Sequence, residues 1–389
     1  MTHIPYSRQE IDASDIEAVT QALRSDFLTQ GPRIDAFEAA FSAEHQVKHA
    51  VAVSSATAGL HIACLALGVG PRSLVWTSPN SFVASSNCAL YCGAEVDFVD
   101  IDPLTRNMCT RQLEEKLAKA ERAGRLPSVV IPVHFAGFAC DMRAISALAG
   151  RYGFKVIEDA SHATGAAYEG APIGSRYADL SVFSFHAVKI ITTGEGGMVT
   201  TSSDRLAMQL RSLRSHGITR DPAAFEGSAH GPWYYEHQQL GFNYRITDIH
   251  AALGLSQLQR MTGWREARER LADRYDFKLR GLPLRSPARP AGRTSSWHLY
   301  VVELGSDSHT IDRGRVFAAM REAGIGVNVH YIPIHTHPHY QRLGFKQGDF
   351  PAAEAYYLRA LSLPLYPAMS DAQQDHVVDL LAQALEAQR

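Results

Sequence analysis

The sequence predicts an α/β protein: a large domain with a mainly parallel central sheet flanked by helices, and a smaller α+β domain after it. Short apolar runs alternate with amphipathic helical stretches between residues 47 and 201, which favours parallel strands with helices on both faces. After residue 247 long helices dominate instead. A chain of 389 residues is also too long for one ordinary core. We therefore expect two domains, residues 1–250 and 251–389.

The elements of the first domain follow an N-terminal arm that runs to about Ala43 and holds a helix at Ser14–Arg24. Apolar runs of a strand's length predict strands at Ala50–Val53, Leu74–Thr77, Val96–Val99, Val129–Val133, Lys155–Ile157, Leu180–Ser184 and Met198–Thr201. Helical periodicity between them predicts helices at Ala56–Leu67, Ser81–Tyr91, Thr110–Ala123 and Met142–Tyr152. Asp141 is a suitable N-cap for the last of these helices.

The second domain is expected to be mostly helical, with two short strands. A segment rich in proline, glycine and arginine, Pro283–Gly292, reads as a loop. The predicted helices are Ile246–Gln259, Arg265–Arg280, Asp312–Glu322 and Asp371–Ala387, and the predicted strands are His298–Glu303 and Gly326–His330.

Composition excludes several classes of protein. The formal net charge is −2, from 38 basic and 40 acidic residues, so the protein lacks the positive electrostatic potential that binds a nucleic-acid backbone. No apolar run is long enough to span a bilayer, and residues 1–6 lack the build of a signal peptide, so we expect a cytoplasmic protein with no membrane partner. The five cysteines are scattered and odd in number, which indicates packed thiols and neither a disulfide framework nor a metal site.

Two residues thirty positions apart carry the strongest chemical signal. Asp159 follows a buried strand, where a carboxylate either caps a loop or pairs with a protonated ring nitrogen. Lys189 has apolar neighbours on both sides and precedes the turn Thr192–Gly197. A lysine is usually a solvated charge, but burial lowers the pKa of its amine and makes it a nucleophile toward carbonyls. Taken together, the pair favours covalent attachment of a carbonyl cofactor to Lys189.

Further residues suit a phosphorylated, flat cofactor. Ser55 and Thr57 lie between a strand and a helix, where they act either as N-caps or as part of an anion site at the helix N-terminus. Ser184 offers a hydroxyl five residues before Lys189. Phe82 is either a core aromatic or a stacking platform, and His162 is either a satisfied core histidine or a donor to the cofactor.

With these residues in place, the chain resembles the DegT/DnrJ/EryC1/StrS family of sugar aminotransferases. The resemblance rests on Asp159, His162 and the run Ser184–Gly197, and it extends over nearly the whole chain. Several separated motifs in the same order are far more specific than one short pattern. The other matching stretches are Ile4-Pro5-Tyr6, Leu28–Pro32, Ser55-Ala56-Thr57, Asn243-Tyr244-Arg245 and Val329–Ile334.

The resemblance implies a fold type I enzyme dependent on pyridoxal 5'-phosphate. It implies that Lys189 carries the cofactor and then moves a proton, while Asp159 pairs with the pyridine nitrogen. It implies that Phe82 stacks on the cofactor ring and that His162 donates to the cofactor. It also implies phosphate contacts from Ser55, Ala56, Thr57 and Ser184, and from Asn243 across a homodimer interface. It implies substrate contacts for Tyr6, Arg245, His330 and Tyr331.

Within the family, three stretches are most similar to one branch: Ser25–Gly31, Ser184–Lys189 and Arg214–Ile218. The resemblance to that branch implies amination of C4 of UDP-4-keto-6-deoxy-β-L-AltNAc in pseudaminic acid biosynthesis, with L-glutamate as the expected donor. The alternatives are another nucleotide-linked 4-keto-sugar, such as a UDP-4-keto-pentose or GDP-4-keto-6-deoxymannose, a sugar dehydratase, or a non-catalytic ligand sensor. Lys189 argues against a dehydratase, since such relatives carry histidine there. One departure is His250, where many relatives carry glutamine.

Overall fold

The computed structural model describes residues 3–305 and 310–388. Its centre is a seven-stranded sheet in the order β1-β9-β8-β5-β4-β2-β3. The four pairs from β8 to β3 are parallel, whereas β9 is antiparallel to both β1 and β8. The predicted, mainly parallel sheet is therefore confirmed. Its strands are β1 (His49–Val53), β2 (Leu74–Thr77), β3 (Glu95–Phe98), β4 (Val129–Ile131), β5 (Lys155–Asp159), β8 (Leu180–Ser184) and β9 (Gly197–Thr201).

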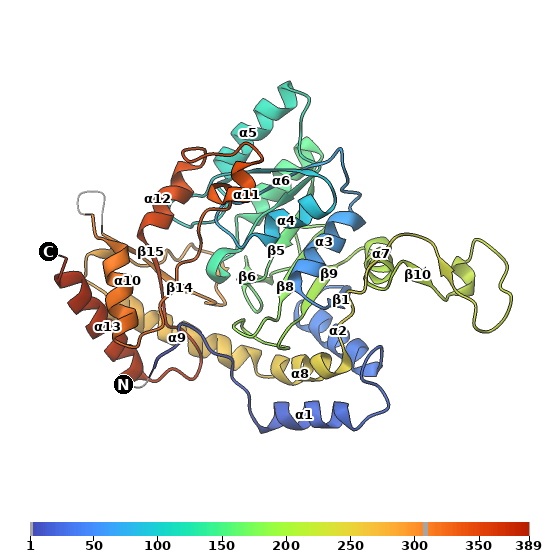
Figure 1. The fold of residues 1–389 in the computed structure, drawn as a ribbon, viewed down its shortest axis with the longest axis horizontal. Coiled ribbons are helices and arrows are strands. Elements are labelled where there is room, and N and C mark those ends of the chain that lie inside the picture. Colours follow the sequence, from blue (N-terminus) through green and yellow to red (C-terminus); the bar gives the residue numbers. More distant parts are fainter. Residues whose placement is uncertain (1–2, 306–309, 389) are drawn as a thin grey trace.

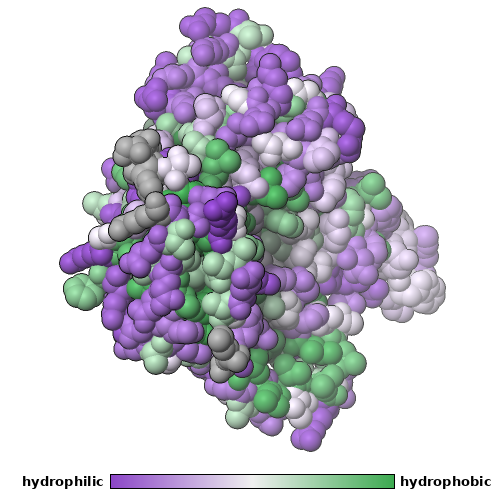
Figure 2. All heavy atoms as spheres, turned by 60° about the vertical axis from the view of Figure 1, so that its left-hand side comes forward, coloured by the Kyte–Doolittle hydropathy of each residue, from purple (hydrophilic) through white to green (hydrophobic). Residues whose placement is uncertain are grey.

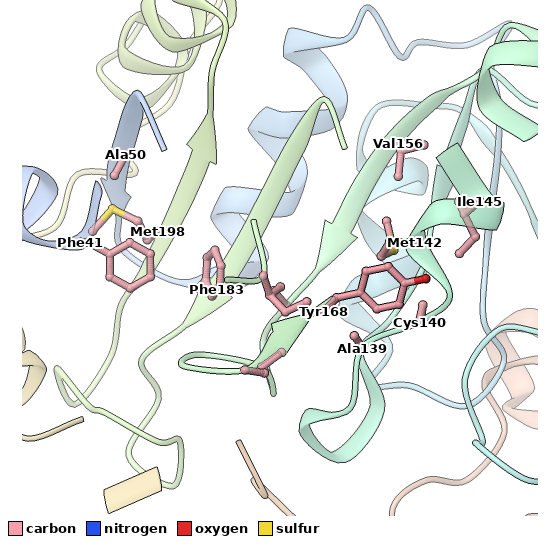
Figure 3. Packing of buried hydrophobic residues seen from close by; sticks show 14 of the residues in the cluster. Phe41, Ala50, Ala139, Cys140, Met142, Ile145, Val156, Tyr168, Phe183 and Met198 are labelled. Atoms are coloured by element: carbon pink, nitrogen blue, oxygen red, sulfur yellow. The ribbon is translucent and has the colours of Figure 1, made fainter. Parts of the chain in front are cut away.

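Helices cover both faces of this sheet (Figure 1). Two separate hydrophobic clusters result, one on each face. In one of them Phe41, Phe183 and Met198 pack together, and Met142, Cys140 and Tyr168 continue the layer (Figure 3). The helices that accompany the sheet are α2 (Pro32–Glu44), α3 (Ala56–Ala66), α4 (Ala84–Tyr91), α5 (Thr110–Arg122), α6 (Met142–Tyr152) and α7 (Asp204–Arg214).

The later part of the chain builds a second, smaller sheet of three antiparallel strands, β12 (Leu284–Arg285), β14 (Tyr300–Leu304) and β15 (Ala360–Leu363). A third hydrophobic cluster packs between it and the neighbouring helices. The helices that contribute to it are α9 (Met261–Lys278), α10 (Arg313–Glu322) and α13 (Asp371–Glu386), while α12 (Pro351–Arg359) packs with β14 in a fourth cluster. The division predicted after residue 250 stays a prediction; α8 (Asp248–Leu258) spans that position.

Most predicted elements are confirmed, including the Asp141 N-cap, whose carboxylate accepts from the Ala144 amide. Three expectations are wrong, the first being the loop Pro283–Gly292, which contains β12 because Leu284 and Arg285 pair with β14. The helix expected from Ser81 begins at Ala84, so Phe82 lies before it. No strand forms at 326–330, because the backbone there is shared between two partners: Gly326 donates to Ile4 and Asn328 pairs with Ser362. Split pairing of this kind leaves no continuous ladder.

Two features lie at the periphery. Helix α1 (Ala13–Leu23) packs on α8 at the lower edge of Figure 1, and the hairpin β10–β11 (Ile218–Thr219 and Glu236–His237) projects from the body. Figure 2 shows hydrophobic residues gathered at the lower end of the molecule, in the region of α1. The most exposed large apolar side chains are Ile16 and Leu23 on α1 and Trp233 in the hairpin, and the exposed Leu240 lies three residues after the hairpin. Within the described residues, no helix is both long and apolar enough to cross a bilayer.

Candidate active site

A cavity of about 500 Å³ lies at the carboxyl ends of the parallel strands. Ligands in α/β proteins bind at this edge of the sheet, and a volume of this size suits a small-molecule site. Strand β5 places Asp159 there, and the loop after β8 places Lys189 there. Of the thirteen residues predicted for the site, eleven line the cavity: Tyr6, Ser55, Ala56, Thr57, Phe82, Asp159, His162, Ser184, Lys189, His330 and Tyr331.

The Lys189 amine faces the cavity. Burial lowers its pKa from 10.5 to about 8, and the nearby Asp159 charge opposes that shift. A substantial fraction of the amine is consequently neutral near pH 8, as nucleophilic attack on a carbonyl requires. Its hydrogen-bond partner within the described residues is His298, whose Nε2 lies 3.4 Å from Lys189 Nζ.

Asp159 is 4% exposed and is held by two donors. Its Oδ2 accepts from the Ser85 hydroxyl at 2.6 Å, and its Oδ1 accepts from the Ser161 amide at 3.1 Å. The Ser85 hydroxyl also lies 2.7 Å from that of Ser81. Donors of this kind stabilise the ionised form of a carboxyl group. The buried carboxylate therefore suits a cationic ring nitrogen.

An anion site adjoins the lysine at the N-terminus of α3. Ser55 caps the helix by accepting from the Ala58 amide, while Ala56 and Thr57 occupy its first turn. Backbone amides of a first turn lack partners inside the helix, so they attract anions. Gly197 of β9 is packed against this turn, where a Cβ would lie 2.7 Å from the Ala56 nitrogen. Ser184 adds its hydroxyl from the end of β8.

Aromatic and imidazole groups form the remaining walls. Phe82 lines the cavity with 60% of its surface exposed, and so offers an open flat face. His162 accepts from the Ala136 amide through Nδ1, and burial is the main cause that lowers its pKa well below 6.5. The proton of the neutral ring consequently belongs on Nε2, which lies 3.0 Å from the Tyr331 oxygen. Both His162 nitrogens thus have protein partners, and the Tyr331 hydroxyl hydrogen is left for a ligand.

The two remaining predicted residues lie outside this cavity. Asn243 is exposed and pairs with Ser215. Arg245 lines a separate cavity of about 210 Å³ together with Gln30, Asp35 and Arg214. The described residues that line the Lys189 cavity include no arginine. His250, the departure from the usual glutamine, is engaged with Thr247 at the start of α8, its Nδ1 lying 3.0 Å from Thr247 Oγ1.

Among the cavity-lining residues that the sequence analysis did not identify, Ser85 and His298 stand out because their side chains contact Asp159 and Lys189. Ser85 was hidden among other serines of a predicted helix, and nothing local distinguishes it. His298 was assigned only to the start of a strand. A buried histidine at the edge of a predicted strand is a weak signal, and 109 residues separate it from Lys189.

The residues present fit pyridoxal phosphate. A lysine with a lowered pKa, a buried carboxylate, an anion-binding helix N-terminus and an open aromatic face surround one cavity. The fold and the site define the chain as a sugar aminotransferase dependent on pyridoxal phosphate, in agreement with its relatives. The chain belongs to the DegT/DnrJ/EryC1/StrS aminotransferase family, whose model matches residues 9–382.

Three known proteins illustrate the similarity. The spore coat polysaccharide biosynthesis protein SpsC of Bacillus subtilis is 42% identical over 97% of this chain and 95% of its own. The structure of Helicobacter pylori PseC, an aminotransferase of pseudaminic acid biosynthesis, is 29% identical, with a TM-score of 0.90 over 99% of this chain and 100% of that one. The pyridoxal-phosphate form of the putative sugar aminotransferase Spr1654 of Streptococcus pneumoniae is 29% identical, with a TM-score of 0.90 over 100% of both chains.

Proposed function

We propose that this enzyme transfers the amino group of L-glutamate to C4 of UDP-4-keto-6-deoxy-β-L-AltNAc, a step of pseudaminic acid biosynthesis in the cytoplasm. The similarity to PseC over the full chain supports this substrate. The observation that carries the proposed chemistry is Lys189, with its lowered pKa, in one cavity with the buried Asp159.

Bound pyridoxal phosphate supplies a carbonyl for amines and a ring that withdraws electrons from the substrate carbon. We assign to Asp159 the task of holding a proton on the ring nitrogen. Lys189 anchors the cofactor, and its free amine then moves a proton at the substrate carbon. Phe82 stacks on the ring and His162 lies at its edge. Ser55, Ala56, Thr57 and Ser184 hold the phosphate.

The sugar faces neutral groups under this proposal. Tyr6, His330 and Tyr331 line the wall of the cavity beyond the lysine. Burial lowers the pKa of His330 to about 3, and it raises the pKa values of Tyr6 and Tyr331, so all three side chains are uncharged near neutral pH. Neutral donors and acceptors suit hydroxyl and acetamido groups of a sugar.

The enzyme is proposed to act as a homodimer. Glutamate carboxylates and a diphosphate call for guanidinium groups, and the described lining of the Lys189 cavity has none. Arg245 and the exposed Asn243 lie outside that cavity and are proposed to reach the site of a second copy. The exposed apolar side chains of α1 and of the projecting hairpin provide contact surface for such a partner.

A second candidate is the same reaction on a different nucleotide-linked 4-keto-sugar. It is favoured by SpsC, which shares more identity with this chain than PseC does and is described by spore coat polysaccharide synthesis. The amination chemistry is common to both candidates, so only the sugar distinguishes them.

The test incubates the purified protein with pyridoxal phosphate, L-glutamate and each keto-sugar in turn. We expect 2-oxoglutarate and a 4-amino product, identified by mass spectrometry, at the highest kcat/KM with UDP-4-keto-6-deoxy-β-L-AltNAc. The Lys189→Met control should lose at least ~10²–10⁴-fold in kcat, the range of general acid–base catalysis alone. A higher kcat/KM with a UDP-4-keto-pentose or a GDP-linked sugar would assign the second candidate. Borohydride treatment that left Lys189 unlabelled would reject both.

A further inference from the structure

His298 enters the cavity from the smaller sheet. It lies two residues before β14, and the backbone on its N-terminal side is anchored. The buried Arg268 donates to the Trp297 carbonyl at 3.0 Å, and the Ser296 hydroxyl donates to the His162 carbonyl at 2.6 Å. These bonds join the segment before β14 to α9 and to the loop after β5. The imidazole, only 3% exposed, is therefore held in a fixed position.

The ring is arranged for Lys189. Its Nε2 lies 3.4 Å from Lys189 Nζ, and its centroid lies 4.4 Å from that of His162. Burial lowers the pKa of His298 well below 6.5, and the charges of Lys189 and Arg268 act in the same direction. A neutral imidazole has one nitrogen free to accept a hydrogen bond.

A purely structural role explains the site poorly. Buried polar atoms kept for packing are almost always hydrogen-bonded. The Nδ1 atom of His298 is buried without a partner among the described residues, whereas Nε2 is directed at a reactive amine. Within the part of the chain that the structure describes, the nitrogens of this histidine thus make one contact, with Lys189.

We propose that His298 is a positioning residue for Lys189: its neutral Nε2 accepts a hydrogen bond from the Lys189 ammonium and keeps Nζ directed into the cavity whenever the amine is not bonded to cofactor. This rests on the proposed role of Lys189 as the proton carrier. The proton moves between the substrate carbon and Nζ, while the imidazole keeps its own proton on Nδ1. Because burial first, and the charges of Lys189 and Arg268 after it, disfavour a charged imidazole, His298 does not compete for the moving proton.

The experiment measures the protonation of Lys189 in the cofactor-free protein. Brief labelling with acetic anhydride over a pH series modifies only neutral amines, and mass spectrometry of the Lys189 peptide gives the midpoint. The other ionisable groups that line the cavity of Lys189 are Tyr6, Asp159, His162, His186, Glu195, His298, His330 and Tyr331, and each variant changes at most one of them. The wild-type midpoint is expected near 8.

In His298→Leu the midpoint should fall by about one pH unit, because the ammonium loses a charged hydrogen bond. His298→Gln, which retains an acceptor, should stay close to the wild type. His298→Met, which lacks a nitrogen or oxygen acceptor, is measured alongside in case the leucine variant does not fold. His45→Leu is the matched control: His45 is equally buried but stacks on Phe41, away from the cavity lining.

The titration midpoints test the role of His298 independently of the proposed reaction, since the measurement needs no cofactor. Equal midpoints in wild type, His298→Leu and His298→Met would overturn the role of His298, as would an equal shift in His45→Leu. In the loaded enzyme we expect His298→Leu to lower kcat by roughly tenfold and His298→Gln to restore most of it. Borohydride reduction of the loaded wild type separately reports whether Lys189 carries the cofactor at all.

Discussion

The two sides of the cavity differ in charge. The side formed by the seven-stranded sheet carries a carboxylate and an amine, Asp159 and Lys189. The opposite side, from the later part of the chain, presents His298, His330 and Tyr331, which burial keeps neutral. The difference teaches that the charged lining groups, Glu195 included, belong to the side proposed to handle protons, while the wall proposed to meet the sugar offers only neutral donors and acceptors. Each side should therefore respond differently to substitution.

The largest effect is expected on the charged side, in the stability of the cofactor-free protein. Burial lowers the pKa of Lys189 from 10.5 to about 8, so below pH 8 the folded state holds an ammonium at a cost of about 3 kcal/mol. Lys189→Met should remove that cost and raise the free energy of unfolding at neutral pH by about 2–3 kcal/mol. Urea unfolding of both cofactor-free proteins measures the difference.

The sign of the pH dependence sharpens this prediction. Between pH 8 and 10.5 the unfolded chain still binds a proton at Lys189 that the folded protein has released, so wild-type stability rises with pH. The advantage of Lys189→Met should shrink over that window and be absent above it. Lys155→Met is the control, because the exposed Lys155 pairs with Asp179 at the surface and should change stability by less than about 0.5 kcal/mol. A pH-independent advantage would show that packing, and not charge, is responsible.

The sequence revealed the charged side more fully than the neutral one, for a physical reason. Asp159 and Ser184 end buried strands and the first turn of α3 follows another, and parallel strands bring their carboxyl ends to one edge. The local sequence pattern of each strand was therefore enough to predict that these groups lie at the same edge of the sheet. The neutral side depends on long-range packing: β14 pairs with β12 and β15, and only that pairing carries His298 to Lys189. No spacing within the sequence encodes such a contact.

A smaller effect is expected at Ser85, whose hydroxyl donates a hydrogen bond to the Asp159 carboxylate on the charged side of the cavity. Ser85→Ala removes the 2.6 Å hydrogen bond to Asp159 Oδ2 and leaves the Ser161 amide as the remaining donor. The carboxylate then holds the ring proton less well, and kcat should fall about tenfold, the equivalent of a charged hydrogen bond near 1.5 kcal/mol. Steady-state kinetics and a pH titration of the cofactor absorbance measure the loss.

Ser86 offers the matched control for this variant. It is the next residue of α4, equally buried, and its hydroxyl donates to the Val83 carbonyl and lies beside the Tyr340 hydroxyl, with no bond to Asp159. Ser86→Ala should leave the absorbance titration unchanged. A shift of the same size in both variants would mean that α4 itself had moved. The effect could then not be assigned to the hydrogen bond between Ser85 and Asp159.

The smallest effect is expected on the neutral side, at Tyr331. In Tyr331→Phe the His162 Nε2 loses the phenol oxygen 3.0 Å away, while Nδ1 still accepts from Ala136. The cavity also loses a donor for the sugar. Because a neutral hydrogen bond contributes about 0.5–1.5 kcal/mol, kcat/KM should fall roughly 2- to 10-fold, with the change in KM and little change in kcat. A loss confined to kcat would instead place Tyr331 with the proton chemistry, and the contrast between the two sides of the cavity would no longer hold.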